Sequence, residues 1–196
     1  MGAGRWLWGA GLFAGACAAG VAVSRQPELA EADRELFNAV NAGHGPDADR
    51  VFVTVTELGS MYAAGAAAAS LVMTGRARAG IKAFSAASAT WLILQGLKKL
   101  VARPRPIDAA DHGARQLIAR PNGMSWPSSH PAVLTTFTRV ASQELGSGAG
   151  VKGALTALDA TVATSRVYLG VHFPSDVVSG LLIGRAVARV WPRRRS

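Results

Sequence analysis

Three short clusters of cationic, hydroxyl and imidazole side chains interrupt an otherwise apolar sequence of 196 residues. They are Lys98 with Arg103, Arg105 and Pro106; Trp126-Pro127-Ser128-Ser129-His130; and Ser165-Arg166 with His172 and Asp176. Transfer of a phosphoryl group spreads negative charge over its equatorial oxygens, so a site for it needs several fixed positive charges and hydrogen-bond donors around one centre. Lys98, Arg105 and Arg166 meet that requirement, so the clusters predict a phosphoryl-binding site.

The middle cluster is expected to begin a helix. Ser128 and Ser129 precede a helix that would start near His130 and Pro131. Proline is tolerated in a first helical turn, because the amide hydrogen that it lacks would have no intrahelical partner there. Free backbone amides and the helix dipole favour an anion at such an end, so these serines are expected to form a phosphate cradle.

The three clusters match, in order and register, the signature K-x6-R-P, P-S-G-H and S-R-x5-H-x3-D. The chain therefore resembles the type 2 phosphatidic acid phosphatase (PAP2) superfamily over Lys98 to Asp176. One position departs from the pattern, because Ser129 stands where the family usually has glycine. If that glycine served a positive φ angle, serine would be strained, whereas a role as backbone donor survives the change.

The resemblance implies a role for each residue of the signature. His172 would attack phosphorus and form a phosphohistidine, while Asp176 would accept a hydrogen bond from the other ring nitrogen and fix the orientation of the ring. His130 would protonate the leaving oxygen and later activate water. The residues expected to bind the phosphate are Lys98, Arg105, Ser128, Ser129 and Arg166, with Arg103 as a secondary candidate.

The elements that must position these clusters are apolar enough to be membrane-spanning helices. Hydrophobic residues make up 49% of the chain and charged residues 17%. The expected spans are Trp6–Val23, Val51–Thr74, Gly80–Leu97, Pro131–Leu145, Val151–Leu169 and Val177–Trp191. Small residues such as those in Met61–Leu71 favour close helix contacts, so we expect an all-α integral-membrane bundle of about six helices.

The N-terminal quarter of the chain leaves two questions open. The run Trp6–Val23 suits either an uncleaved anchor, which we expect, or a signal peptide. Apolar residues within Ser24–Arg50 recur at helical spacing, which indicates either an amphipathic helix near the membrane surface or a linker. We expect a single unit, with residues 1–50 as anchor and external segment and residues 51–196 as the catalytic bundle.

Charge sets the expected orientation. Arg76, Arg78 and Lys82 lie between the second and third spans, and three arginines follow the last one, so both places are expected to be cytoplasmic. The cation-rich connection from Lys98 to His130 then faces outward, against the usual bias. Binding of a phosphate would explain this exception, although long loops also cross membranes regardless of charge.

Metal and cofactor chemistry is not expected. The sequence has no H-x-x-x-H or paired-carboxylate run, and His172 with Asp176 supplies too few ligands for a metal. His44 and His112 lie outside the clusters and are expected at the surface. Asp159, within an expected span, is predicted to serve a function or to pair, with Arg139 as its partner.

These observations favour a lipid phosphate as substrate, with the lipid tail in the membrane and the active site on the external side of a bacterial plasma membrane. We expect a prenyl-linked substrate of the cell envelope, either a polyprenyl phosphate or diphosphate or a polyprenyl-phosphosugar phosphate, with phosphatidic acid and phosphatidylglycerol phosphate as alternatives. The rivals are a vanadium-dependent haloperoxidase, whose pocket is similar, and a transport or scaffold protein with a relic motif. Nucleic-acid binding, suggested by the net charge of +9, is not expected, because the cations are divided between the two membrane sides.

Overall fold

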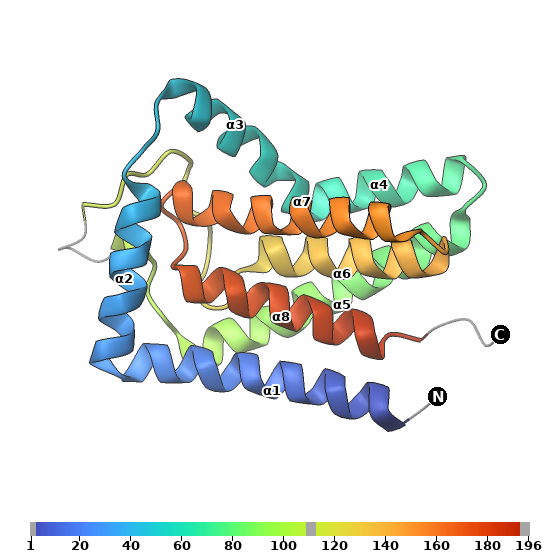
Figure 1. Cartoon of the computed structure of the whole chain (residues 1–196), viewed down its shortest axis with the longest axis horizontal. Helices are drawn as coiled ribbons and strands as arrows, with labels where there is room; N and C mark the ends of the chain where they lie inside the picture. Colours follow the sequence, from blue (N-terminus) through green and yellow to red (C-terminus); the bar gives the residue numbers. More distant parts are fainter. Residues whose placement is uncertain (1–2, 109–112, 193–196) are drawn as a thin grey trace.

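The computed structural model describes residues 3–108 and 113–192, and the regular elements in these ranges are all helical (Figure 1). The helices are α1 (Ala3–Arg25), α2 (Pro27–Asn41), α3 (Pro46–Thr56), α4 (Met61–Met73), α5 (Ala77–Val101), α6 (Ser129–Glu144), α7 (Ala149–Tyr168) and α8 (Pro174–Val190). Two single turns of 3₁₀ helix, η1 (Glu57–Gly59) and η2 (Pro106–Asp108), complete the set. The expectation of an all-α bundle is confirmed.

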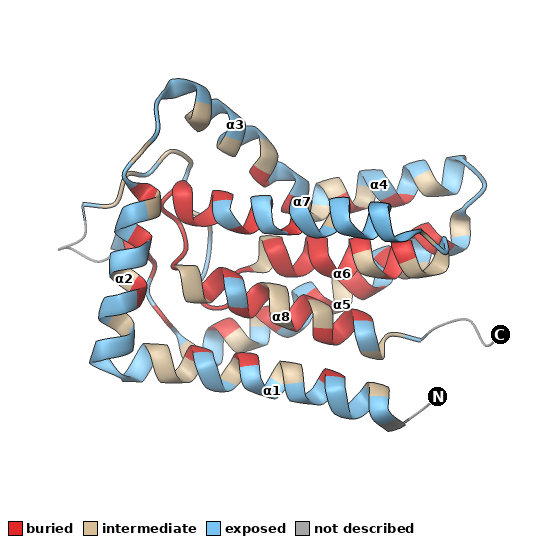
Figure 2. Cartoon of the chain, in the orientation of Figure 1, coloured by how far each residue is buried: buried red, intermediate tan, exposed pale blue. Residues whose placement is uncertain are grey.

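Helix α6 forms the centre of the bundle. It packs against α5, α7 and α8, and most of its residues are buried (Figure 2). Small residues allow this close packing, since a β-carbon at Gly184 of α8 would lie 2.6 Å from the Ala132 carbonyl oxygen of α6. A β-carbon at Gly80 of α5 would likewise lie 2.6 Å from the Ala68 carbonyl oxygen of α4. The small residues therefore bring the helix backbones together, as expected.

Five of the six expected spans are single helices, namely α1, α5, α6, α7 and α8. The span expected over Val51–Thr74 is wrong as a continuous helix, because α3 and α4 meet at an angle of 63°. Ser60 is extended, and its hydroxyl accepts a hydrogen bond from the Ala63 amide at 3.1 Å, which begins α4 anew. Gly59 packs directly against the side chain of His130, so the break brings this turn to the N-terminus of α6.

The segment Ser24–Arg50 contains helix α2, which runs across one end of the bundle and contacts α1, α7 and α8 (Figure 1). Its inner face buries Asp33, Phe37 and Asn41, while most of the remaining side chains are exposed. The ring of Phe37 packs 5.5 Å from the ring of Phe173, measured between centroids. The amphipathic helix is therefore confirmed over the alternative of a linker.

By length and composition, one helix in the described ranges could cross a membrane by itself, Gly4–Arg25, and the bent pair Pro46–Gly59 with Met61–Met73 meets the same criterion together. Large apolar side chains are nevertheless exposed on several helices. They include Trp6, Leu7 and Trp8 on α1, Tyr62 and Met73 on α4, and Trp91, Leu92 and Leu100 on α5. Exposed apolar surface of this extent is typical of a membrane or protein contact.

Two smaller expectations have different outcomes. Asp159 is buried, but its hydrogen-bond donor is the Thr138 hydroxyl at 3.2 Å, and no ion pair with Arg139 forms in the described part of the chain. The Thr138 hydroxyl, at the adjacent position of α6, donates the hydrogen bond, while Arg139 acts on Asp159 only through the attraction of its charge, so the expected pairing does not take the form of an ion pair. His44 is exposed, as expected, and His112 lies outside the described residues.

Candidate active site

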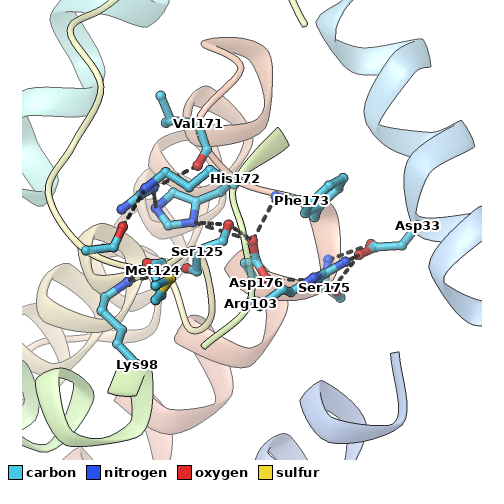
Figure 3. Close-up of polar contacts among 12 residues, drawn as sticks. Asp33, Lys98, Arg103, Met124, Ser125, Val171, His172, Phe173, Ser175 and Asp176 are labelled. Atoms are coloured by element: carbon cyan, nitrogen blue, oxygen red, sulfur yellow. Dashed lines mark hydrogen bonds and ion pairs between the residues drawn. The ribbon is translucent and has the colours of Figure 1, made fainter. Parts of the chain in front are cut away.

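Segments far apart in the sequence meet at one end of the bundle, where α2 crosses it. Lys98 comes from the last turn of α5, Ser125 from the long connection before α6, and His172 and Asp176 from the turn that begins α8 (Figure 3). Arg166 reaches the same region from the last turn of α7. The three clusters of the sequence are therefore brought together, as expected.

His172 lies at the centre of this region and is 2% exposed. Its Nε2 atom lies 3.2 Å from Nη1 of Arg105, which can only donate, so Nε2 is the acceptor. On the other side of the ring, Nδ1 lies 3.4 Å from the Ser125 hydroxyl and 3.5 Å from Oδ2 of Asp176. This arrangement fits a neutral imidazole that carries its proton on Nδ1 and keeps a lone pair on Nε2.

The electrostatic surroundings favour the same neutral form. Burial lowers the pKa of His172 well below its usual value, and the charges of Lys98, Arg105, Arg166 and His130 lower it further. A lone pair on Nε2 is what a nucleophilic histidine needs.

Asp176 is fully buried, and both carboxylate oxygens have partners. Oδ2 accepts hydrogen bonds from the Phe173 amide at 2.9 Å and the Ser125 hydroxyl at 2.5 Å, while Oδ1 accepts one from Arg103 at 2.8 Å. Ser125 and Asp176 therefore both contact Nδ1 of His172. The sequence did not predict this contact of Ser125, although the residue directly precedes the middle cluster.

Three buried cations surround His172 without a carboxylate partner. The Lys98 ammonium donates to the Met124 and Ser125 carbonyl oxygens, at 2.8 and 3.3 Å. Arg105 donates to the Val171 carbonyl oxygen at 2.8 Å and to backbone carbonyls of the long connection, and Arg166 donates to the Thr56 hydroxyl at 2.8 Å. No Asp or Glu in the described ranges forms an ion pair with any of the three.

Burial makes the charged form of these side chains less favourable. Burial lowers the pKa of Arg105 to about 10. Because ionised groups are expensive to bury without a partner, this end of the bundle favours an anion.

Three other cations of the connection between α5 and α6 form ion pairs with carboxylates. Arg103 pairs with Asp33 and Asp176, each at 2.8 Å. Arg115 pairs with Asp49 at 2.9 Å, and Arg120 pairs with Asp108 at 2.7 Å. Phosphate binding was expected to explain the cations of this connection. It does not explain these three, because each of them forms an ion pair with a carboxylate of the protein.

The N-terminus of α6 supplies the hydroxyl groups of the site. The Ser128 amide donates to the Asp176 carbonyl oxygen at 3.0 Å, which joins this end to α8. The hydroxyls of Ser128 and Ser129 are buried without a hydrogen-bond partner. Ser129 is the first residue of the helix and has no positive φ angle, so serine in place of glycine introduces no backbone strain there.

His130 shares this site from the second position of α6. Lys98, Arg105 and Arg166 lie near enough to act on it electrostatically, and Gly59 of η1 packs against its side chain. Thr56 and Gly59 thus belong to the surroundings of the site through the break between α3 and α4, which the sequence did not predict. Among the described residues, no group of three or more His, Cys, Asp and Glu side chains is arranged to hold a metal ion.

The fold and the site together define a class: an all-α bundle that gathers two histidines and several unpaired cations at one end. Residues 78–195, more than half of the chain and all three clusters, match the PAP2 superfamily. The chain belongs to this superfamily.

Known proteins support the same assignment. Over 113 residues the chain is 36% identical to the decaprenylphosphoryl-5-phosphoribose phosphatase of Mycobacterium tuberculosis, a match that covers 57% of this chain and only 56% of that relative. LpxE of Aquifex aeolicus has the same fold, with a TM-score of 0.71 and 28% identity over 79% of this chain and 90% of that one. A transmembrane PAP2-type phosphatidylglycerolphosphate phosphatase from Bacillus subtilis also shares the fold, with a TM-score of 0.75 and 22% identity over 91% of each chain.

Proposed function

We propose that this protein is a membrane phosphatase that hydrolyses a phosphate ester or diphosphate of a lipid through a phosphohistidine on His172. The observation that carries this proposal is the set of three buried cations, Lys98, Arg105 and Arg166, none paired with a carboxylate of the described residues. A phosphoryl group supplies negative charge and several acceptor oxygens, which match the donors of these side chains.

The reaction would proceed in two steps. In the first, Nε2 of His172 attacks phosphorus, and a bond between Nε2 and phosphorus forms while the bond to the leaving oxygen breaks. His130 gives a proton to that oxygen. In the second step, water attacks phosphorus, His130 accepts a proton from the water, and the bond between Nε2 and phosphorus breaks to release phosphate.

The remaining groups would orient the ring and stabilise charge. Asp176 and Ser125 hold Nδ1 of His172, so that Nε2 faces the phosphorus atom. Lys98, Arg105 and Arg166 stabilise the charge that develops on the equatorial oxygens. The hydroxyls of Ser128 and Ser129 and the first amides of α6 add neutral donors. Arg103 forms ion pairs with Asp33 and Asp176, so its role would be to orient Asp176 and not to bind the phosphate.

Membrane integration is supported by the apolar helix α1, by the exposed apolar side chains of α1, α4 and α5, and by the fold shared with a transmembrane phosphatase. We propose that the end with His172 lies at the external boundary of a bacterial plasma membrane and that the C-terminus is cytoplasmic. Residues 1–50 would serve as anchor and external segment of a single unit whose catalytic bundle is residues 51–196.

A prenyl-linked phosphate or diphosphate is the substrate that we favour, because the Mycobacterium tuberculosis relative is named for a decaprenylphosphoryl compound. Its tail would remain in lipid while the phosphate enters the cationic site. Phosphatidic acid and phosphatidylglycerol phosphate carry the same reacting group and are the alternatives.

The experiment is phosphate release by the purified protein in detergent, with a panel of prenyl phosphates and diphosphates, phosphatidic acid and phosphatidylglycerol phosphate. We expect release in the presence of EDTA, and we expect H172A to abolish release while it retains the elution profile of the folded protein. Activity that disappears with EDTA and returns with a divalent metal, or an H172A variant with undiminished activity, would contradict the proposal.

A further inference from the structure

Asp33 is a buried carboxylate of α2 whose partners all lie near the catalytic turn (Figure 3). Its Oδ1 atom accepts a hydrogen bond from the Ser175 amide at 2.9 Å. Its Oδ2 atom accepts hydrogen bonds from the Ser175 hydroxyl at 2.5 Å and from Nη2 of Arg103 at 2.8 Å. Ser175 lies between His172 and Asp176 and is separated from Asp33 by 142 positions.

Arg103 continues this connection to the nucleophile. Its Nη1 atom donates to Asp176 at 2.8 Å and to the Ser175 hydroxyl at 2.7 Å, and its guanidinium lies 4.3 Å above the ring of Phe173. Asp176 in turn contacts Nδ1 of His172 directly and through Ser125. A continuous set of polar contacts therefore leads from α2 to the imidazole.

This arrangement is more than a means of docking α2. Phe37 already packs α2 against Phe173, and Asn41 donates to the Tyr168 carbonyl oxygen at 2.8 Å. Burying two carboxylates around one guanidinium requires their desolvation, and apolar side chains would attach the helix at least as well. A buried charged network of this kind is best explained by the geometry that it fixes.

We propose that Asp33 is a positioning residue for His172, acting through Arg103, Ser175 and Asp176. The Asp33 carboxylate gives Arg103 a second ion-pair partner besides Asp176. The guanidinium therefore does not turn toward the substrate phosphate, and its charge is shared between the two carboxylates. Asp33 also fixes the backbone of the turn from His172 to Asp176. This inference rests on the proposed function, and it assigns part of the active-site framework to α2, a helix outside the residues that match the family.

The test compares D33N with E35Q. Both remove one negative charge from α2, but Glu35 is exposed and its side chain makes no hydrogen bond or ion pair with the described residues. In D33N we expect kcat to fall by about 10- to 100-fold with a small change in KM, since a shift of about 1 Å in a reacting group has an effect of that size. E35Q should retain wild-type kcat and KM. D33E, which restores the charge, should recover part of the lost kcat.

A second readout does not depend on activity. In protein labelled with ¹⁵N-histidine, H172A identifies the ring signals of His172 among those of the four histidines. We expect D33N to shift the His172 signals and E35Q to leave them in place. S175A, which removes the hydroxyl shared by Asp33 and Arg103 but keeps both carboxylates, should produce a smaller shift and a smaller loss of kcat, and it provides the test if D33N does not fold.

The outcomes separate the two proposals. If D33N, or S175A in its place, matches wild type in kcat and in the His172 signals, the positioning role is wrong while the phosphatase function stands. A loss of activity in D33N that is fully accounted for by a smaller folded fraction, with unchanged His172 signals, also overturns the role. If wild-type protein releases no phosphate from any lipid, the proposed function fails, and the spectroscopic comparison alone decides whether Asp33 positions His172.

Discussion

Two sets of three cations lie at the same end of the bundle, and they differ in their partners. Lys98, Arg105 and Arg166 donate to backbone carbonyls and a hydroxyl, whereas a second set, Arg103, Arg115 and Arg120, pairs with carboxylates. The second set satisfies its charge within the protein. The first set leaves its charge for a ligand, and it is the first set that surrounds His172.

This difference shows that a count of cations in a connecting segment does not identify a binding site. Arg105 and Arg115 have the same chemistry and lie ten positions apart, yet only Arg105 contacts His172. What separates them is whether the guanidinium forms an ion pair with a carboxylate of the described residues, which depends on the fold. Variants that remove a cation of the first set should therefore lower activity far more than variants that remove a cation of the second set.

The largest effect is expected from R166Q, which removes one unpaired cation. If Arg166 stabilises charge in the transition state, as we propose, kcat/KM should fall by about 10²- to 10³-fold. The assay is initial rates of phosphate release over a range of lipid phosphate concentrations, with the melting temperature in detergent as a measure of folding. A folded R166Q protein with a wild-type rate would show that the unpaired cations are not catalytic.

The pH dependence of kcat/KM should respond to K98Q but not to K99Q. Burial and then the charge of Lys98 lower the pKa of His172, so loss of that charge raises the pKa of His172 toward about 6.5. Protonated His172 has no lone pair on Nε2, so activity disappears as pH falls through this pKa, and the acid limb of the profile should move to higher pH in K98Q.

K99Q is the matched control, because Lys99 is the adjacent residue, is exposed and has no carboxylate partner. Ionisation of the substrate is the same for both variants, so a difference between their profiles reports on the protein. Identical acid limbs in K98Q, K99Q and wild type would show that the charge of Lys98 does not act on His172.

R115Q should affect stability more than catalysis. Arg115 pairs with Asp49, and its guanidinium lies 5.0 Å from the centre of the Tyr168 ring, so it holds the connection between α5 and α6 against α3 and α7. We expect the melting temperature in detergent to fall by about 2 to 4 °C while kcat/KM stays within about twofold of wild type. A loss of activity as large as that of R166Q would remove the distinction between the two sets.

R120Q should have the smallest effect. The Arg120 side chain is 48% exposed, and its ion pair with Asp108 is open to solvent, where such pairs contribute little. We expect a melting temperature and a kcat/KM indistinguishable from wild type in parallel assays. A marked fall in kcat/KM would mean that Arg120 leaves Asp108 and contacts the substrate.

The resemblance of the three motifs to the PAP2 signature was enough to predict that Lys98, Arg105, His130, Arg166 and His172 meet, and the flanking apolar runs predicted that each motif lies at a helix end. The break between α3 and α4 was not predicted, because the apolar run continues through it. At that break Gly59 packs against His130, which lies 71 positions further along the chain.

Asp33 could not be distinguished from the sequence for a similar reason. It is one of several acidic residues in α2, and nothing nearby separates it from Glu31 or Glu35. Its partners Arg103 and Ser175 lie 70 and 142 positions away. Local periodicity predicts that α2 is amphipathic, yet Leu29 and Leu36 are exposed, and only the assembled bundle reveals that a carboxylate on the buried face meets the turn from His172 to Asp176.

The most direct test is to trap the phosphorylated enzyme. Protein mixed with a lipid phosphate labelled at phosphorus and quenched within milliseconds in base, where a phosphorus–nitrogen bond survives, should carry the label on the peptide that contains His172. The label should be absent from H172A and should disappear with time as water completes the reaction. Label on a different residue, or phosphate release with no labelled enzyme at any time, would contradict the assignment of His172 as the nucleophile.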